Sequence, residues 1–194
     1  MFTLILDSSN IDLSVGLAKE NELIDFTNYE AWQCQSEYMV EEIDKLLKKH
    51  SLTRTDLKDV MVTIGPGSYT GLRIALTIAK VTSLALNIPL YALSSLHVLK
   101  CGDKPSICLL NARSNRSYIG VYEGSKVILK DQILKNEEVK EYIASHPEYV
   151  VCGDAAYLGL KGYKANVCLE MLSLKEAATK YEDSLGVHPL YLKD

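Results

Sequence analysis

A glycine-rich bend between an apolar run and a helical run contains the residue types closest to phosphate chemistry. It reads VTIGPGSYTGLRIALTIAK, over residues 62–80. Backbone N–H groups at the start of a helix bind phosphates in many nucleotide sites. A P-loop needs a lysine directly after its second glycine, but Leu72 follows Gly71 here. The spacing of Gly65, Gly67 and Gly71 does not match a dinucleotide fingerprint either, so the bend is predicted to be structural.

As a structural loop, the bend turns the chain sharply from a strand into a helix. Proline fixes φ, glycine adopts φ values that other residues avoid, and serine or threonine caps the first turn of a helix. We therefore predict a structural glycine loop made of Gly65, Pro66, Gly67, Ser68 and Thr70.

The histidines and cysteines show no spacing typical of metal ligands or catalytic nucleophiles. There are four histidines, on different predicted elements, and five cysteines with no C-x-x-C pair. We expect no bound metal, no catalytic residue and reduced, mostly buried thiols. The residues are His50, His97, His146, His188, Cys34, Cys101, Cys108, Cys152 and Cys168.

The composition is that of an ordinary soluble protein. The chain has 194 residues, is 47% hydrophobic and carries a net charge of −4. An acidic balance argues against binding nucleic acid unaided, because phosphate neutralisation needs clustered basic residues. The N-terminus has no basic region ahead of its apolar residues, and no apolar run approaches the roughly 18 residues of a membrane span. We expect a cytoplasmic protein that reaches RNA only through a partner.

The order of predicted elements indicates an α/β fold. Strands are expected at 3–7, 12–18, 22–28, 59–64 and 90–93, with helices at Ser36–Lys49, capped by Ser36, and at Thr70–Leu86. The second half is expected to hold strands at 106–111, 117–123, 125–133 and 149–152 and helices at 136–145 and Ser173–Leu185. A meander followed by alternating helices and strands gives a mixed sheet, the ribonuclease-H-like unit of actin-like ATPases and sugar kinases.

The helix over residues 70–86 has an unusually wide apolar arc. Small residues recur every four positions, which lets another backbone approach closely, and bulky residues on the other flank suit the sheet core. A helix lying on one sheet needs a narrower arc, so this one is expected to be covered from two sides. Either this chain's own helix 36–49 or second half covers the small row, or another chain does. The small row is Gly71, Ala75, Ala79 and Ser83; the bulky flank is Ile74, Ile78, Val81 and Ala85.

Several segments together resemble the bacterial TsaB family, also called YeaZ. The most specific is IGPGSYTGLRIALTIAK at 64–80, supported by LILDSSNIDLSVGL at 4–17 and SEYMVEEIDKLLKK at 36–49. Weaker matches are LLNARSNRSYIGVY at 109–122, CGDAAYLG at 152–159 and HPLYLK at 188–193. The resemblance covers nearly the whole chain.

The resemblance implies an actin-like two-lobed fold with mixed sheets. An N-terminal lobe is expected at residues 1–100 and a smaller, reduced C-terminal lobe at 101–194. It implies a non-catalytic subunit that dimerises with and activates the transferase TsaD, which makes N6-threonylcarbamoyladenosine next to the anticodon of tRNAs. TsaE, a small ATPase, joins that complex, and in isolation a homodimer is expected.

The resemblance also locates the partner contact in a bundle built from the helices at 36–49 and 70–86. The interface residues predicted on these helices are Met39, Ile43, Leu46, Leu47, Gly71, Leu72, Ala75, Ala79 and Ser83.

The turn Asp7-Ser8-Ser9 occupies the place of the first phosphate loop of actin-like ATPases. Such loops normally carry glycine so that backbone N–H groups approach the phosphate, and this turn has none. These three residues are the candidate nucleotide contact, with ATP or ADP expected only in complex with partners. The alternative hypothesis is an actin-like ATPase or phosphotransferase that binds ATP between the lobes.

Overall fold

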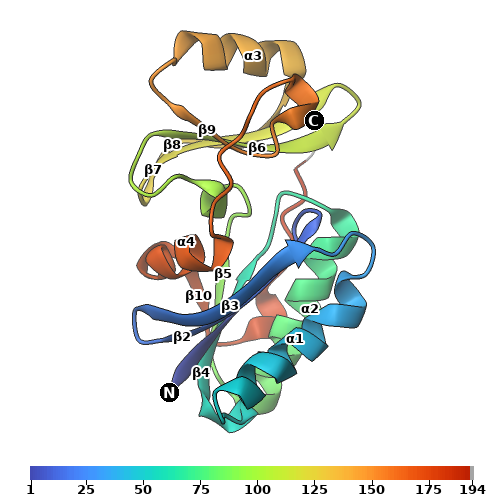
Figure 1. Cartoon of the computed structure of the whole chain (residues 1–194), viewed down its shortest axis with the longest axis vertical. Coiled ribbons are helices and arrows are strands. Elements are labelled where there is room, and N and C mark those ends of the chain that lie inside the picture. Colours follow the sequence, from blue (N-terminus) through green and yellow to red (C-terminus); the bar gives the residue numbers. More distant parts are fainter. Residues whose placement is uncertain (193–194) are drawn as a thin grey trace.

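The first half of the chain forms most of one sheet and the two helices beside it. The computed structural model describes residues 1–192 and is shown in Figure 1. Its first elements are β1 (Phe2–Asp7), β2 (Asp12–Lys19), β3 (Glu22–Glu30), α1 (Gln35–Lys49), β4 (Leu57–Thr63), α2 (Tyr69–Leu86) and β5 (Leu90–Leu93). Each lies within about two residues of its predicted position, and the mixed α/β architecture is confirmed.

The end of α2 agrees with its prediction, whereas the start of α1 differs. The αL residue Asn87 ends α2 at the predicted place, with φ of 53°. The predicted cap of α1 is wrong: the cap position is Cys34, with no side-chain cap, and the helix starts at Gln35. The Gln35 side chain is buried and donates to the backbone oxygen of Asn10, 3.1 Å away, so it ties α1 to the end of the β1–β2 turn.

The second half forms a smaller sheet with one helix above it. Its elements are β6 (Ser106–Arg113), β7 (Arg116–Glu123), β8 (Lys126–Lys135), α3 (Asn136–Ser145) and β9 (Val150–Gly153), with strand order β8-β7-β6-β9. The predicted hairpin turn is present, because Gly124 has φ of 56° between β7 and β8. In Figure 1 this sheet and α3 lie at the upper end of the molecule.

The chain then returns to the first sheet. α4 (Val167–Ser173) packs on β1, β2 and β3, and β10 (Thr179–Tyr181) pairs antiparallel with β5. The first sheet has the order β10-β5-β4-β1-β2-β3. Residues 101–194, expected as one lobe, therefore supply elements to both sheets.

The predicted helix Ser173–Leu185 is wrong. α4 ends at Ser173, a short 3-10 turn covers Lys175–Ala177, and β10 follows. Thr179 and Tyr181 are residue types that favour strands, and the edge of β5 offers backbone groups that a helix would leave unpaired. Tertiary pairing thus overrides the helical pattern of this segment.

Alternation along β1 shows how the two halves pack together. Leu4 and Leu6 lie in the core under α1 and α2, whereas Ile5 lies in a second core that includes Met171 of α4 and Cys108 of β6. That second core is shared by both sheets, so the two halves pack closely, as the absence of a linker predicts. A third core lies between the second sheet and α3.

Two buried ion pairs fasten the returning segment. Lys175 Nζ lies 2.6 Å from an oxygen of Asp59 on β4 and also donates to Thr3 on β1. Lys100, after β5, pairs with Glu170 of α4, and both side chains are almost wholly buried. Removing one partner of such a pair strands a charge in the core, so these contacts fix α4 and the C-terminal segment on the first sheet.

Candidate functional site

The glycine loop joins β4 to α2 and packs directly on the turn that follows β1. The Ser68 hydroxyl accepts a hydrogen bond from the Gly71 N–H, 3.2 Å away, which confirms Ser68 as the cap of α2. The Ser68 N–H in turn donates to the backbone oxygen of Ser9 at 2.7 Å. Gly65 has φ of 120° and lies against the backbone of Leu190, where a side chain would collide. The loop is a packed structural element.

Gly71 lies in the closest approach between α2 and the β1–β2 turn. A Cβ at this position would overlap the backbone oxygen of Ser8. The Ser8 hydroxyl also donates to the Gly71 carbonyl oxygen at 2.7 Å, so the two backbones are held together from both sides. A Cβ at Gly67 would likewise overlap the Ser9 oxygen. The turn and the glycine loop therefore fill the space that an open phosphate loop would leave.

The three residues predicted to contact nucleotide all lie inside the molecule. Asp7, Ser8 and Ser9 are 1%, 0% and 2% exposed. Thr63 Oγ1 donates to the Asp7 carboxylate, and the Ser9 N–H donates to it at 3.2 Å. Burial raises the pKa of the Asp7 carboxyl, against these hydrogen bonds, which lower it. In this arrangement Asp7 orders its own turn, and none of the three offers an exposed group to a ligand.

Replacing Asp7 by asparagine is expected to change how stability depends on pH. The pKa of the Asp7 carboxyl is higher in the folded protein than its unfolded value of 3.8. The folded state therefore binds this proton more tightly, and wild-type stability falls as the pH rises from 3.8 through the raised folded pKa. Asp7→Asn removes this loss. Urea unfolding at pH 4.5 and pH 7 should show the free energy of unfolding of the variant rising, relative to that of wild type, at the higher pH. A pH-independent difference would contradict the buried, protonation-sensitive carboxyl.

Most of the predicted interface residues are buried by the chain itself. The side of α2 with the small row faces the sheet, and Ala75 and Ala79 are both 0% exposed. α1 packs beside α2 and shares the first core with Ala75 and Ala79, so this chain covers the row, although the first sheet was not among the covers expected for it. Of the predicted set, only Ile43 is not fully buried. The buried members are Met39, Leu46, Leu47, Gly71, Leu72, Ala75, Ala79 and Ser83.

The bulky flank of α2 is only partly covered, because Ile74 and Ile78 pack against the first core and Val81 lies outside it. Val81 is 61% exposed, and Ile74 and Ile78 are half-buried. These three positions follow the i, i+4, i+7 spacing of one helical face. On α1, Val40 is 51% exposed and Ile43 lies one turn further on. We call Val40, Ile43, Ile74, Ile78 and Val81 the outer strip.

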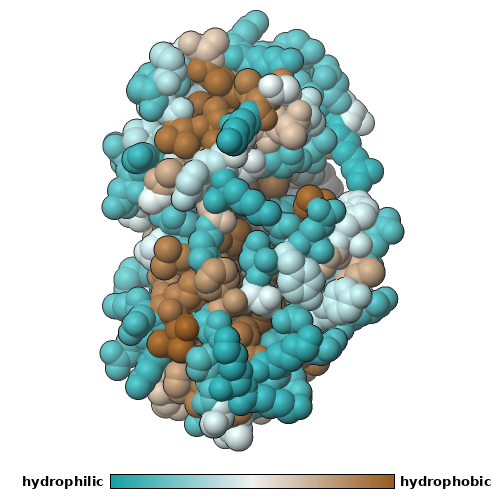
Figure 2. Space-filling model, in the orientation of Figure 1, coloured by the Kyte–Doolittle hydropathy of each residue, from teal (hydrophilic) through white to brown (hydrophobic). Residues whose placement is uncertain are grey.

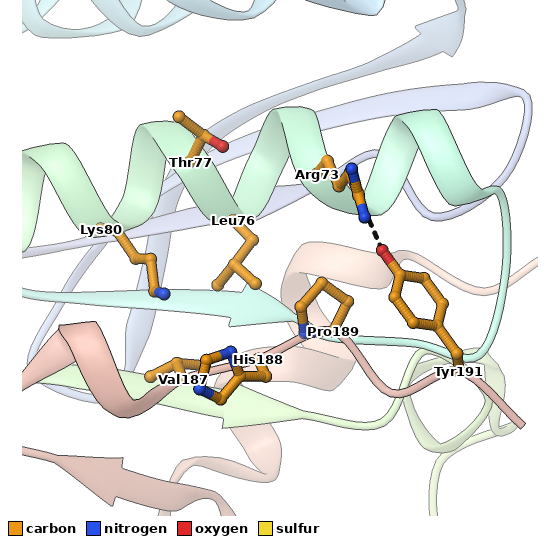
Figure 3. Close-up of a pocket in the computed structure, with 8 residues that line it drawn as sticks. All are labelled: Arg73, Leu76, Thr77, Lys80, Val187, His188, Pro189 and Tyr191. Atoms are coloured by element: carbon orange, nitrogen blue, oxygen red, sulfur yellow. Dashed lines mark hydrogen bonds between the residues drawn. The ribbon is translucent and has the colours of Figure 1, made fainter.

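A groove lies along the other flank of α2, between this helix and the C-terminal segment over residues 187–191 (Figure 3). It has a volume of about 460 Å³ and is lined by Arg73, Leu76, Thr77 and Lys80 of α2 and by residues 187–189 and Tyr191. The segment is fixed by a hydrogen bond of 2.6 Å from the Leu190 N–H to the Ile64 oxygen. The groove was not predicted from the sequence, although Arg73, Lys80 and the HPLYLK motif at 188–193 were signals of it.

An aromatic pair lies beside the groove: Tyr191 is one of its lining residues, and Tyr69 contacts Tyr191 from outside the lining. Tyr69 and Tyr191 stack with ring centroids 5.1 Å apart. The Arg73 guanidinium lies 4.0 Å from the centre of the Tyr69 ring, and its Nε donates to the Tyr191 hydroxyl at 2.8 Å. The guanidinium thus lies over the Tyr69 ring and is farther from the Tyr191 ring, 5.9 Å from its centre, so the aromatic pair holds the cation from one side.

No metal cluster is formed by the histidines, cysteines and acidic residues of the part of the chain that the structure describes. His50 contacts Asp25, His97 contacts the Gly124 oxygen, and His188 lies at the groove. All five cysteines are free, and Cys108, Cys152 and Cys168 are buried. Within residues 1–192, no helix has the length and apolar character to cross a membrane.

Comparison with known proteins places this arrangement in a family. The model of a family described as TsaD, tRNA N6-adenosine threonylcarbamoyltransferase, matches residues 30–179. The TsaB protein of Bacillus subtilis, named for tRNA threonylcarbamoyladenosine biosynthesis, is 31% identical over 144 residues, or 72% of this chain. The chain belongs to the TsaB (YeaZ) family. The match covers 62% of the Bacillus protein's length.

Other known proteins match this chain over 90% or more of its length. The uncharacterized protein MG208 of Mycoplasma genitalium is 30% identical over 198 residues, which is 100% of this chain and 95% of that protein. The structure of YeaZ from Pseudomonas aeruginosa superposes with a TM-score of 0.82 at 20% identity, over 98% of this chain and 99% of that one. The ethanolamine utilization protein EutJ of Carboxydothermus hydrogenoformans shares the fold more distantly, with a TM-score of 0.52 at 13% identity over 90% of each chain.

Proposed function

We propose that this TsaB-family chain is a non-catalytic subunit that binds and activates a TsaD homologue in forming N6-threonylcarbamoyladenosine in tRNA. The observation that carries the proposal is the outer strip. It leaves apolar side chains of two adjacent helices incompletely covered, with Val40 and Val81 exposed, in a chain whose family takes part in tRNA threonylcarbamoyladenosine biosynthesis. Exposed apolar surface on neighbouring helices is typical of an interface that a partner's helices cover.

The shape of the strip supports a helical partner. Ile74, Ile78 and Val81 form a row along α2, and Val40 and Ile43 supply the neighbouring α1. Rows of this kind pack into the grooves of a facing helix pair. In the absence of a TsaD homologue, the same strip would pair two copies of this chain, so the proposal includes a homodimer in isolation.

The packing of the glycine loop on the turn after β1 supports a non-catalytic role. The turn after β1 and the glycine loop fill each other's space, and Asp7 is enclosed by Thr63 and Ser9. A phosphate loop needs accessible N–H groups, whereas here the Ser68 N–H already donates a hydrogen bond to the backbone oxygen of Ser9. We therefore assign the transfer reaction to the TsaD partner. We also propose that TsaE joins the complex and supplies ATP hydrolysis, which this chain does not.

The decisive experiment is co-purification with the TsaD homologue of the same organism. The expected result is a stoichiometric heterodimer on size-exclusion chromatography, and threonylcarbamoylation of tRNA only when both chains are present. A TsaD homologue that is fully active alone, with no association between the two chains, would refute the proposal.

Titration calorimetry with Mg-ATP tests the proposed absence of nucleotide chemistry in the isolated chain. No heat of binding is expected at micromolar protein, because the Asp7–Ser9 turn is buried. Binding with turnover would instead support the alternative of an actin-like ATPase or phosphotransferase. The isolated TsaD homologue is a suitable comparison under the same conditions.

A further inference from the structure

We propose that the groove beside α2 binds the phosphate backbone of single-stranded RNA, with a base stacked on the Tyr69–Tyr191 pair. The inference rests on the proposed function, because it assigns this chain a direct contact with the RNA. The earlier expectation, from net charge, was that RNA is reached only through a partner.

The charge of the groove lining is opposite to that of the whole chain. Arg73, Lys80 and His188 line it, and none of its lining residues is acidic. The chain as a whole has 25 acidic against 21 basic residues and a net charge of −4. A local concentration of basic side chains on an acidic protein is the electrostatic pattern of a phosphate contact.

Neutral hydrogen-bond partners position the two cationic groups of α2, and no carboxylate of the groove lining neutralises them. Lys80 Nζ donates to the backbone oxygen of Leu185 at 3.2 Å, which uses one of the three hydrogens of the ammonium group. Arg73 uses its Nε–H on Tyr191, and arginine has four further N–H donors. Figure 3 shows Arg73 and Lys80 both reaching from α2 toward the C-terminal segment, with Leu76 between them. Both cations are thus held by neutral partners with donors to spare.

The stacked tyrosines favour a nucleic acid over a simple anion. Tyr69 is 57% exposed and Tyr191 is 38% exposed, although large aromatic side chains gain by burial. Aromatic faces next to a cationic groove are the arrangement that binds unpaired bases in single-strand binders. A duplex conceals its base faces, so the platform selects a single strand.

The groove and the outer strip occupy different sides of α2. Successive residues turn by about 100°, so Arg73, Thr77 and Lys80 lie roughly a third of a turn away from Ile74, Ile78 and Val81. A partner helix on the outer strip leaves the groove side of α2 open. RNA in the groove would therefore lie alongside a bound transferase.

The test uses the whole chain without any partner. The probe is a fluorescein-labelled single-stranded oligoadenylate of about 12 nucleotides, followed by fluorescence polarisation at several salt concentrations. Phosphate contacts by the two cations, Arg73 and Lys80, predict that log Kd rises with log salt with a slope of about 1.4. Lys80→Ala and Arg73→Gln should each weaken binding about fivefold and lower the slope by about 0.7. Tyr69→Ala should weaken it about tenfold with little change in slope.

Matched controls separate the groove from general charge and aromatic content. Lys126→Ala removes an exposed lysine of β8, and Tyr38→Ala removes an exposed tyrosine of α1. Neither should change the affinity by more than twofold, and circular dichroism should show every variant folded. Equal weakening by the controls, no weakening by the groove variants, or no binding of the probe would overturn the proposal.

Two competitors distinguish the source of the phosphate. AMP and inorganic phosphate, at the same phosphate concentration as unlabelled oligoadenylate, should fail to displace the probe. Displacement by AMP would identify a free-nucleotide site and would also overturn the proposal. Because the partner is absent, failure here leaves co-purification with a TsaD homologue unaffected, and failure of co-purification leaves this measurement unaffected.

Discussion

Gly71→Ala is expected to destabilise the protein by about 3 kcal/mol, although it places alanine inside a helix. Helix propensity alone predicts the opposite sign, because alanine in a helix is favoured over glycine by about 1 kcal/mol. The steric clash outweighs the gain in helix propensity. A Cβ at Gly71 overlaps the Ser8 carbonyl oxygen, which is backbone and cannot rotate away. The Ser8 hydroxyl, bonded to the Gly71 oxygen, holds the two segments at that distance.

Urea unfolding followed by circular dichroism measures this effect, and the melting temperature should fall by about 10 °C. Gly186→Ala is the matched control, since a Cβ there meets nothing within 4 Å and should change stability by less than about 0.5 kcal/mol. A Gly71→Ala protein as stable as wild type would mean that the turn after β1 does not pack on α2 as described. It would also mean that the row of small residues on α2, including Gly71, is exposed and available to a partner, as the sequence pattern allowed.

The elements of the fold were accessible from the sequence because local patterns specify them. Alternation in residues 12–18, the helical stripe of residues 36–49 and the Asn87 stop each act within a few residues. The C-terminal segment was not accessible in this way. Thr179–Tyr181 becomes a strand because β5 has a free edge, and that edge is created by residues about 90 positions earlier in the chain.

The site was predicted in composition but not in orientation. The glycine loop, its Ser68 cap and the two helices are where the sequence placed them. A helical wheel shows that α2 has an apolar arc wide enough for two contacts, but it does not show which flank faces the sheet. The small residues Ala75 and Ala79 lie in the first core, where α2 packs on β4, so Ile78 lies at the border of that core and Val81 is exposed.

The groove could not be predicted from the sequence, because its two sides come from distant parts of the chain. Tyr191 and Arg73 are 118 positions apart, and only the path of the C-terminal segment brings them to 2.8 Å. Residue types on α2 indicated a basic stripe, which is more often a solvated helix face than a binding surface. The aromatic partner that gives this stripe a defined shape comes from a segment whose course depends on β10 and the Leu190–Ile64 hydrogen bond.

Val81→Arg is expected to abolish the complex with a TsaD homologue while leaving the monomer folded. Val81 is 61% exposed, so arginine there extends into solvent in the free chain. In a complex that covers the outer strip, the same guanidinium loses water without gaining a partner, and that penalty of about 3 kcal/mol corresponds to more than 100-fold in affinity. Surface plasmon resonance with the immobilised TsaD homologue measures the loss, and the melting temperature checks the fold.

Two companion variants make the result specific to the outer strip. Val127→Arg places the same change at a valine of β8 that is 49% exposed, and it should bind the TsaD homologue as wild type does. Ala79→Arg should fail to fold, because Ala79 is 0% exposed and packs against β1 and β4 in the first core. A folded Ala79→Arg protein that loses only the partner would show that the small row is the interface after all. Wild-type affinity of Val81→Arg would remove the outer strip from the contact, since no apolar interface tolerates an unpaired guanidinium at its centre.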